Sequence, residues 1–273
     1  MDKNINKTFT VLLPLYQRKD LQLNLPKVLF SIYNNSVAPD DLIILIDGQL
    51  TSDFHNLIES EQKKYNFKIL KSKKVGLANI LNKGIEKVKT CWISRMDGDD
   101  LCELDRFENS KKFMNSNYDL FGGQIRELDC RLKYSLLKKV PCSHENIIKS
   151  IKYRNPFNHM TVFYKTDFVK KIGGYPDLYL KEDYALWCKF IYHGAKVANM
   201  NKIVVTAKTD GMHARRGGIK YIISEIKLQK ILLSCNLTNV FTSFFVCVLR
   251  IIIHALPNKI KFLFYNNFLR KKI

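Results

Sequence analysis

The stretch "CWISRMDGDDLCELDRF" (residues 91–107) joins a short apolar run to three carboxylates, Asp97, Asp99 and Asp100, within four positions. The run "CWISRM" has the length and composition of a buried strand, and Gly98 predicts a tight turn where that strand ends. In parallel α/β sheets, ligands bind beyond the carboxyl ends of the strands. The stretch therefore predicts a strand of such a sheet with a polar site at its end.

Strands and helices alternate in the part of the chain that precedes this stretch. We expect strands at 8–14, 41–48 and 67–71, helices at 54–65 and 77–88, and a further helix that begins near Pro26. Strands that alternate with helices of about three turns form βαβ units, so the sequence predicts an α/β protein with a mostly parallel central sheet flanked by helices. Beyond Glu108 the pattern is mixed, with a helix near 105–115, short strands near 119–128 and 160–164, and a helix over 182–194.

Composition and charge narrow the class of protein. The 273 residues are 46% hydrophobic and 12% aromatic, which suits a globular core. The net charge is +20, and from Gly211 to the end eleven basic residues accompany one acid, Glu225. Such a surface attracts phosphates, anionic lipid or nucleic acid. The seven scattered cysteines lack zinc-site spacing and the N-terminus lacks the pattern of a signal peptide, so we expect a cytoplasmic protein.

The C-terminal stretch "LTNVFTSFFVCVLRIIIHALP" (237–257) is strongly apolar, but Arg250 and His254 interrupt it and argue against a membrane-spanning helix. On a helix, a narrow and mostly polar stripe runs between apolar residues: Asn239, Ser243, Cys247, Arg250 and His254. Two interpretations remain, an interfacial membrane helix and a helix pair packed on the main domain. The basic excess favours contact with an anionic membrane.

The acidic triplet predicts a cation site. Neighbouring carboxylates repel each other unless a cation or a shared proton relieves them. Oxygen ligands without histidine suit a hard divalent ion such as Mg²⁺ or Mn²⁺, and the position of Gly98 excludes an EF-hand loop. The alternative is an acidic N-cap for the helix near 105–115, a role that Asp105 would fill alone.

These features occur together in a known family. The chain resembles the family-2 glycosyltransferases of the GT-A (Rossmann-like) fold, in the subgroup that makes bacterial surface polysaccharides. The resemblance runs over roughly residues 8–230 and rests on "FTVLLPLYQR", "IDGQL", "GLANILNKG", "ISRMDGDD…DRF", "FGGQIRELD", "RNPFNHMTVFYK", "IGGYPDLYLKEDYALW" and "RRGGIKYIISEIKLQ". It implies a glycosyltransferase domain over 1–230, with a nucleotide-sugar-binding half (8–105) and an acceptor and catalytic half (106–230). Residues 231–273 would form a membrane-associating helical tail.

The resemblance also implies roles on the donor side. The residues expected to bind the nucleotide-sugar are Pro14, Tyr16, Asp47, Arg95, Asp97, Asp99, Arg215 and Arg216, and those expected to hold Mn²⁺ or Mg²⁺ are Asp99 and Asp100. Many relatives carry two acids before the glycine of the second strand turn, whereas here Ile46 precedes Asp47. We interpret His213, beside the two arginines, as a structural or solvated residue.

On the acceptor side, the resemblance implies that Asp183 is the general base, with Glu182 as the second choice. A base is required because the acceptor hydroxyl loses its proton as its oxygen attacks the sugar. The alternative is that both acids only favour a helix N-terminus through its dipole. Asn155 and His159 are expected to line the acceptor or donor sugar.

The resulting prediction is an inverting, metal-dependent glycosyltransferase, peripheral at the inner face of the cytoplasmic membrane. Its donor would be a UDP-sugar and its acceptor a lipid-linked saccharide. A haloacid-dehalogenase-like phosphatase is a weaker alternative, because Asp100 follows the second aspartate where that class needs Thr or Val. A nucleic-acid-binding protein would fit the charge but leaves the clustered acids and Asp183 unexplained, so we expect no nucleic-acid partner.

Overall fold

The computed structural model describes residues 7–129, 134–208, 218–255 and 271–272. In chain order the elements are β1 (Phe9–Leu15), α1 (Lys19–Tyr33), β2 (Asp41–Asp47), α2 (Ser52–Gln62), β3 (Lys68–Ser72), α3 (Leu77–Lys87), β4 (Trp92–Arg95), β5 (Leu101–Cys102), α4 (Arg106–Met114), β6 (Leu120–Leu128), β7 (Leu136–Lys138), α5 (His144–Ile151), the 3-10 turn η2 (His159–Thr161), β8 (Phe163–Lys165), α6 (Thr166–Lys171), α7 (Glu182–Tyr192), β9 (Val197–Lys208), α8 (Ile219–Ser234), α9 (Val240–Ala255) and β10 (Lys271–Lys272).

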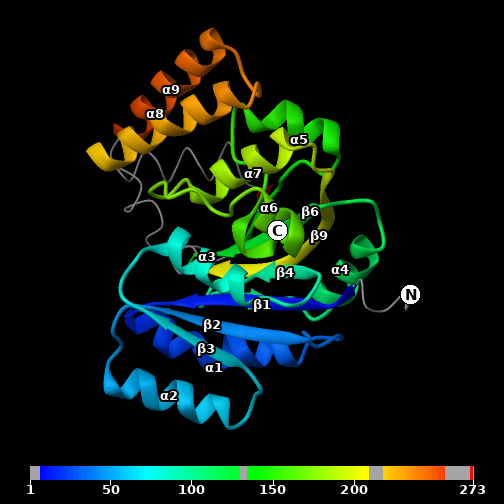
Figure 1. Cartoon of the computed structure of the whole chain (residues 1–273), viewed down its shortest axis with the longest axis vertical. Coiled ribbons are helices and arrows are strands. Elements are labelled where there is room, and N and C mark those ends of the chain that lie inside the picture. The colour runs from blue at the N-terminus through cyan, green and yellow to red at the C-terminus, as the bar shows by residue number, and fades with distance from the viewer. Residues whose placement is uncertain (1–6, 130–133, 209–217, 256–270, 273) are drawn as a thin grey trace.

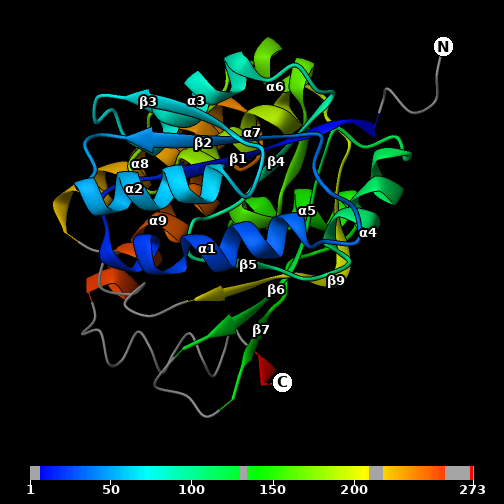
Figure 2. The same cartoon turned by 90° about the horizontal axis from the view of Figure 1, so that it is seen from below.

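One central sheet runs through the molecule (Figure 1). Strands β4, β1, β2 and β3 are parallel neighbours, and β8 joins β4 in the antiparallel sense. The second half adds β6, which is antiparallel to β8 and parallel to β9, and β7, which pairs with both β6 and β10 (Figure 2). The predicted α/β class, with a central sheet flanked by helices, is confirmed. The sheet is parallel in the first half, as predicted, whereas in the second half parallel and antiparallel pairs are mixed.

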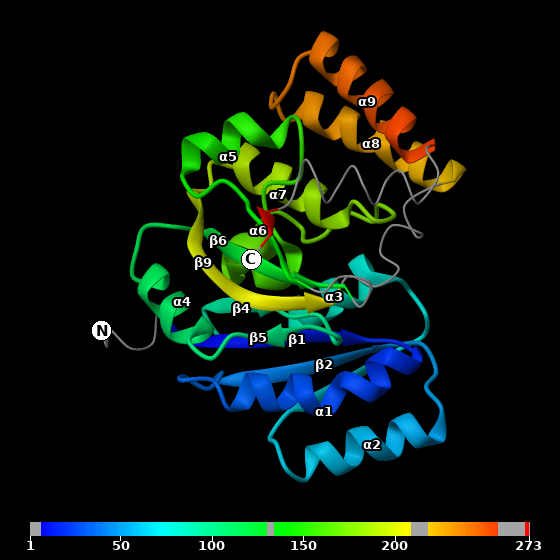
Figure 3. The same cartoon turned by 180° about the vertical axis from the view of Figure 1, so that it is seen from behind.

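Helices cover both faces of the sheet. Helices α1 and α2 lie on one face, and α3, α6 and α7 lie on the other (Figures 1 and 3). Successive residues of β1 alternate between the two resulting cores, so that Val11 packs with the α1 side and Leu12 with the α3 side. Because both faces are buried, all seven residues of β1 are apolar or fully enclosed, as expected for a central parallel strand.

The start of the first helix was predicted wrongly. Helix α1 begins at Lys19, and Pro26 lies in its interior rather than in its first turn. Proline in a helix interior costs roughly 3 kcal/mol, but residues spaced three and four apart form a continuous buried stripe on this helix. The buried residues are Leu21, Leu25, Val28, Leu29 and Ile32. Each contributes about 1.5–3 kcal/mol on burial, which outweighs the cost of the proline.

In the second half, the predicted helices near 105–115 and 182–194 are present as α4 and α7, and the predicted strands as β6 and β8. The twelve-residue strand β9 and the helix α5 were not predicted. Asn201 and Lys202 interrupt the apolar pattern of β9, at the place where its register with β6 shifts. Strand β9 forms because it pairs with both β6 and β5. Tertiary contacts, and not the local sequence pattern, therefore determine it.

The C-terminal region forms a helical hairpin of α8 and α9, stacked outside α7 (Figures 1 and 3). The expected division at 230/231 falls within α8, and the division into domains stays a prediction. Within the described ranges, every helix is too short or too polar to cross a bilayer.

Candidate active site

The acidic triplet lies in a tight turn immediately after β4. Asp100 N donates to Asp97 O at 3.5 Å, and Met96 N donates to Leu12 O at 3.2 Å, so the turn lies against the end of β1. A Cβ on Gly98 would lie 2.6 Å from Leu15 Cδ2. Only glycine therefore allows the turn to pack this closely on the neighbouring strand, which is the physical reason for the residue that separates the acids.

Each carboxylate of the turn contacts a different partner. Asp97 Oδ1 lies 2.5 Å from Arg95 Nη1, Asp99 pairs with Arg18, and Asp100 Oδ1 accepts the backbone N–H of Lys208 at 3.1 Å. Asp100 is almost fully buried, whereas Asp97 and Asp99 are 31% and 21% exposed. Burial, followed by the charges of Asp97 and Asp99, raises the pKa of Asp100 well above its usual range. The pKa of Asp99 is raised by burial and by Asp97 although Arg18 opposes this.

This electrostatic strain fits a divalent cation. Within the described residues, no three acidic, histidine or cysteine side chains are preassembled as a complete metal site. Mg²⁺ and similar ions, however, are usually held by one or two carboxylates, with substrate phosphates and water as the other ligands. Asp99 and Asp100 supply that number of carboxylates. Arg95 is 1% exposed and its Nε has no hydrogen-bond partner in the described part of the chain, which leaves a buried donor beside them.

Two arginines for which the sequence predicted no role stabilise the acidic turn and its surroundings. Arg18 donates to Tyr16 Oη at 2.6 Å and pairs with Asp99, so it links the end of β1 to the acidic turn. Arg106 is fully buried and donates to the carbonyls of Arg95 at 2.8 Å and Met160 at 2.9 Å. Arg18 lies in "YQR" and Arg106 in "DRF", two stretches that carry the family resemblance. The resemblance could therefore have identified both residues from the sequence.

The predicted base-binding residues are placed at the ends of β1 and β2. Tyr16 is 40% exposed directly after β1. Both carboxylate oxygens of Asp47 accept backbone N–H groups, from Val75 at 2.7 Å and from Gly76 at 3.0 Å. Asp47 thus shapes the loop before α3, and its contact with a nucleotide base stays a prediction, as does that of Pro14.

A second acidic corner forms at the first turn of α7, which begins with Glu182 and Asp183. Asn155 Nδ2 donates to Asp183 Oδ2 at 2.7 Å, and the backbone N–H of Tyr184 donates to Oδ1 at 2.7 Å. Asn155 Oδ1 accepts the N–H of Phe157 at 3.1 Å, which fixes the orientation of the amide. Burial raises the pKa of Asp183, although these two hydrogen bonds lower it. Burial and the charge of Asp183 raise the pKa of Glu182 to about 7.

Arg95 connects the two corners electrostatically. Its charge lowers the pKa of Glu182 against the effect of burial, and it adds to burial in holding the pKa of His159 well below its usual range. His159 Nε2 lies 2.9 Å from Tyr175 Oη, a contact that fixes the position of the imidazole. Arg215 and Arg216, together with His213, lie outside the described residues.

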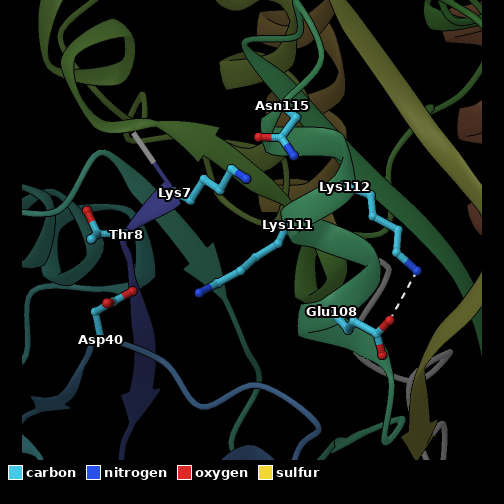
Figure 4. A pocket seen from close by; sticks show the side chains of 7 residues that line it. All are labelled: Lys7, Thr8, Asp40, Glu108, Lys111, Lys112 and Asn115. Carbon is cyan, nitrogen blue, oxygen red and sulfur yellow. Dashed lines mark hydrogen bonds and ion pairs between the residues drawn. The ribbon is translucent and has the colours of Figure 1, made fainter. Parts of the chain in front are cut away.

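A surface cavity lies elsewhere on the molecule. It measures about 660 Å³ and is formed near the amino ends of β1 and β2 by Lys7, Thr8, Asp40, Glu108, Lys111, Lys112 and Asn115 (Figure 4). Ligands of open α/β sheets bind at the carboxyl ends of the strands. The two acidic corners, and not this cavity, therefore form the candidate active site.

Comparisons with known proteins identify the family of the chain. Residues 10–170 match the family model for glycosyl transferase family 2. The Escherichia coli UDP-Gal:alpha-D-GlcNAc-diphosphoundecaprenol beta-1,3-galactosyltransferase is 36% identical over 268 residues, which are 96% of this chain and 97% of that protein. The amylovoran biosynthesis glycosyltransferase AmsE of Erwinia amylovora is 30% identical over 257 residues, covering 92% and 96% of the two chains.

The fold has a solved counterpart. The crystal structure of S. aureus TarS 1-349 in complex with UDP-GlcNAc matches with a TM-score of 0.66 at 14% identity, over 96% of this chain and 75% of that one. The family model covers more than half of the chain and the relatives span nearly all of it, which identifies a glycosyltransferase rather than a phosphatase. The chain belongs to glycosyl transferase family 2, and its fold is of the GT-A type.

Proposed function

We propose that this glycosyltransferase moves a sugar from a UDP-sugar to a hydroxyl of a lipid-linked saccharide, with inversion and with a divalent metal, in the synthesis of a bacterial surface polysaccharide. The observation that carries the proposal is the pair of acidic corners, one after β4 and one at the start of α7, with the buried Arg95 acting on both. The corner after β4 has the chemistry of a nucleotide-sugar donor site, and the corner at the start of α7 has that of a general base. The named substrates of the E. coli relative support the choice of UDP and of a lipid-linked acceptor.

On the donor side, Asp99 and Asp100 would hold Mn²⁺ or Mg²⁺. When bound, the ion offsets the negative charge that develops on the departing nucleoside diphosphate. Arg95 would place a buried positive charge beside the same diphosphate. A charge-assisted hydrogen bond from it would be strong, because water is excluded there. Tyr16, with Pro14 and Asp47, would hold the base and ribose, and Arg215 and Arg216 would contact the diphosphate.

On the acceptor side, Asp183 would remove the proton of the attacking hydroxyl. Each of its oxygens accepts one hydrogen bond, which leaves lone pairs free for the acceptor. A base with a raised pKa binds the transferred proton more strongly, and this favours the transfer. For inversion, the hydroxyl approaches the face of the sugar opposite to the diphosphate. Asn155 holds the base in place, and His159 lies beside the sugar.

The same proposal places the protein at the inner face of the cytoplasmic membrane, as a peripheral enzyme. A lipid-linked acceptor is available only at a bilayer, and the C-terminal region is strongly basic. Positive charge near an anionic surface adds to binding.

The donor site is tested by thermal unfolding of the purified protein with UDP, GDP and CMP, each with and without Mn²⁺. At a hundredfold excess over Kd, binding adds about 2.7 kcal/mol to stability, or roughly 5–11 °C in Tm for a chain of this size. We expect a manganese-dependent shift with UDP that Asp100→Asn abolishes. Asp105→Asn is the matched control, because Asp105 is 51% exposed and lies outside the turn. A protein that no nucleotide stabilises would contradict the proposal.

A further inference from the structure

The hairpin of α8 and α9 turns a large apolar surface outward. On α9 the exposed fractions rise to 88% for Phe241, 72% for Phe244 and 67% for Phe245. The other exposed apolar residues of the hairpin are Val240, Val248, Leu249 and Ile252 on α9 and Ile219, Ile223 and Ile226 on α8. Single exposed apolar residues are ordinary, but ten of them on two helices that pack together are typical of a binding surface.

The orientation of α9 is fixed from inside by polar contacts. Ser243 Oγ donates to Gln229 Oε1 at 3.0 Å, and Gln229 Nε2 donates to Glu225 Oε1 at 2.8 Å. Arg250 Nη1 donates to Glu225 Oε1 at 2.6 Å, and its Nη2 donates to the carbonyl of Tyr153 at 2.7 Å. Ser243 and Arg250, two residues of the stripe that the sequence marked as polar, thus face the domain. Rotation of α9 to bury its phenylalanines would break these contacts, so the apolar face stays outside.

The charge of this surface is of one sign. Glu225 is the single acid between residues 218 and 255, and it is 1% exposed and paired with Lys181 at 2.7 Å. The exposed charges of α8 are Lys220, Lys227 and Lys230. At helical spacing these lysines lie on or beside the side of α8 that carries its exposed isoleucines. The hairpin therefore offers apolar and cationic groups without an exposed carboxylate in its described residues.

We propose that this face, formed by the ten exposed apolar residues and the three lysines, docks on an anionic lipid bilayer. The proposal rests on the proposed function, which requires a lipid-linked acceptor. An interfacial helix buries aromatic residues at the boundary of headgroups and acyl chains and places lysines among anionic headgroups. A second copy of the chain fits less well, because two such faces would bring six lysines together.

Docking through this face would also fix the position of the active site. Lys181 immediately precedes the acids of α7, and Arg250 Nη2 lies 3.4 Å from Tyr184 Oη in the same turn. The docked hairpin and the candidate base are therefore joined through one buried cluster of charges. The membrane would hold the start of α7 at a constant orientation relative to the acceptor.

The test is co-sedimentation of the full chain with vesicles of phosphatidylcholine alone or mixed with phosphatidylglycerol. We compare the wild type with Phe241→Ser/Phe244→Ser/Phe245→Ser, and with Phe30→Ser as the matched control. Phe30 is 57% exposed on α1, far from the hairpin (Figure 1). We expect binding to mixed vesicles to weaken about tenfold for each hairpin phenylalanine and to be unchanged in the control. The triple variant Lys220→Gln/Lys227→Gln/Lys230→Gln should weaken binding about fivefold per lysine. We expect this loss only with the vesicles that contain phosphatidylglycerol.

Folding and oligomeric state are measured on the same samples. Because the substituted side chains are exposed, the Tm of each variant should match that of the wild type. The triple phenylalanine variant sedimenting with vesicles as well as the wild type would overturn the proposal. A wild type that ignores vesicles but dimerises through these phenylalanines would overturn it too, and would identify a second copy as the occupant. Nucleotide-dependent stabilisation is recorded in parallel, because vesicle binding without it would refute the proposed function and leave the docking face intact.

Discussion

Replacement of Glu225 by glutamine should destabilise the protein far more than loss of an ordinary acid. Glu225 accepts from Lys181 through one oxygen and from Arg250 and Gln229 through the other. The side chains of the two cations are only 10% and 14% exposed. Glutamine keeps the size of the side chain but removes its charge. The change therefore leaves two buried cations next to each other without a counter-charge.

The magnitude follows from the burial of the cluster. Removing one partner of a buried ion pair costs about 3–5 kcal/mol, because the remaining charge stays desolvated. For a chain of this size the loss corresponds to a decrease in Tm of roughly 6–20 °C. Arg250→Met should cost less, about 1.5–3 kcal/mol, because Glu225 keeps its partner Lys181.

The pH dependence of stability provides an independent test that the negative charge of Glu225 is stabilising. Burial alone raises the pKa of Glu225, but the charges of Arg250 and Lys181 outweigh it and hold the pKa below its usual value of 4.5. A depressed carboxylate pKa contributes stability above the unfolded pKa and loses it as the pH falls through the folded one. The difference in stability between wild type and Glu225→Gln should thus be full at neutral pH and shrink below about 4.5.

The assay is denaturant unfolding at several pH values, with Glu61→Gln as the matched control. Glu61 is equally buried, but its partner Lys64 is 61% exposed, so its loss should cost below about 1 kcal/mol. If Glu225→Gln costs no more than Glu61→Gln, or if its effect does not change with pH, the buried cluster does not hold the hairpin and the reasoning fails.

Two further predictions concern the active site. Asn155→Ala removes a hydrogen bond that favours ionised Asp183, so the pKa of the base rises. Because the base works deprotonated, the acidic limb of the rate of UDP release should move to higher pH, while Asp183→Asn should lower that rate by about 10²–10⁴. Gly98→Ala forces a Cβ to within 2.6 Å of a β1 side chain, so we expect a loss of about 1–3 kcal/mol of stability and weaker UDP binding. Gly84→Ala is equally crowded, at 2.8 Å from Leu45, but should leave UDP binding unchanged.

An unshifted pH profile in Asn155→Ala would show that Asp183 is not the titrating base. Equal loss of UDP binding in the two glycine variants would show that the acidic turn is not the donor site.

The sequence by itself determined the fold class and the location of the acidic turn. Both depend on local patterns, since a buried parallel strand needs a continuous apolar run and a tight turn needs glycine. The start of α1 escaped prediction because packing of its buried leucines overrode the local signal of Pro26. Strand β9 escaped because its partners, β5 and β6, are distant in the sequence.

Only the tertiary structure decided which groups meet. The polar stripe of 239–254 was visible in the sequence, but whether Ser243 and Arg250 faced lipid, solvent or the domain depended on their partners, which Gln229 and Glu225 on α8 supply. In the same way, Arg18 meets Asp99 and Asn155 meets Asp183 across long stretches of chain. Helical and strand periodicity encode which face of one element is apolar. They do not encode which distant element neutralises a buried charge, because that depends on how the whole chain packs.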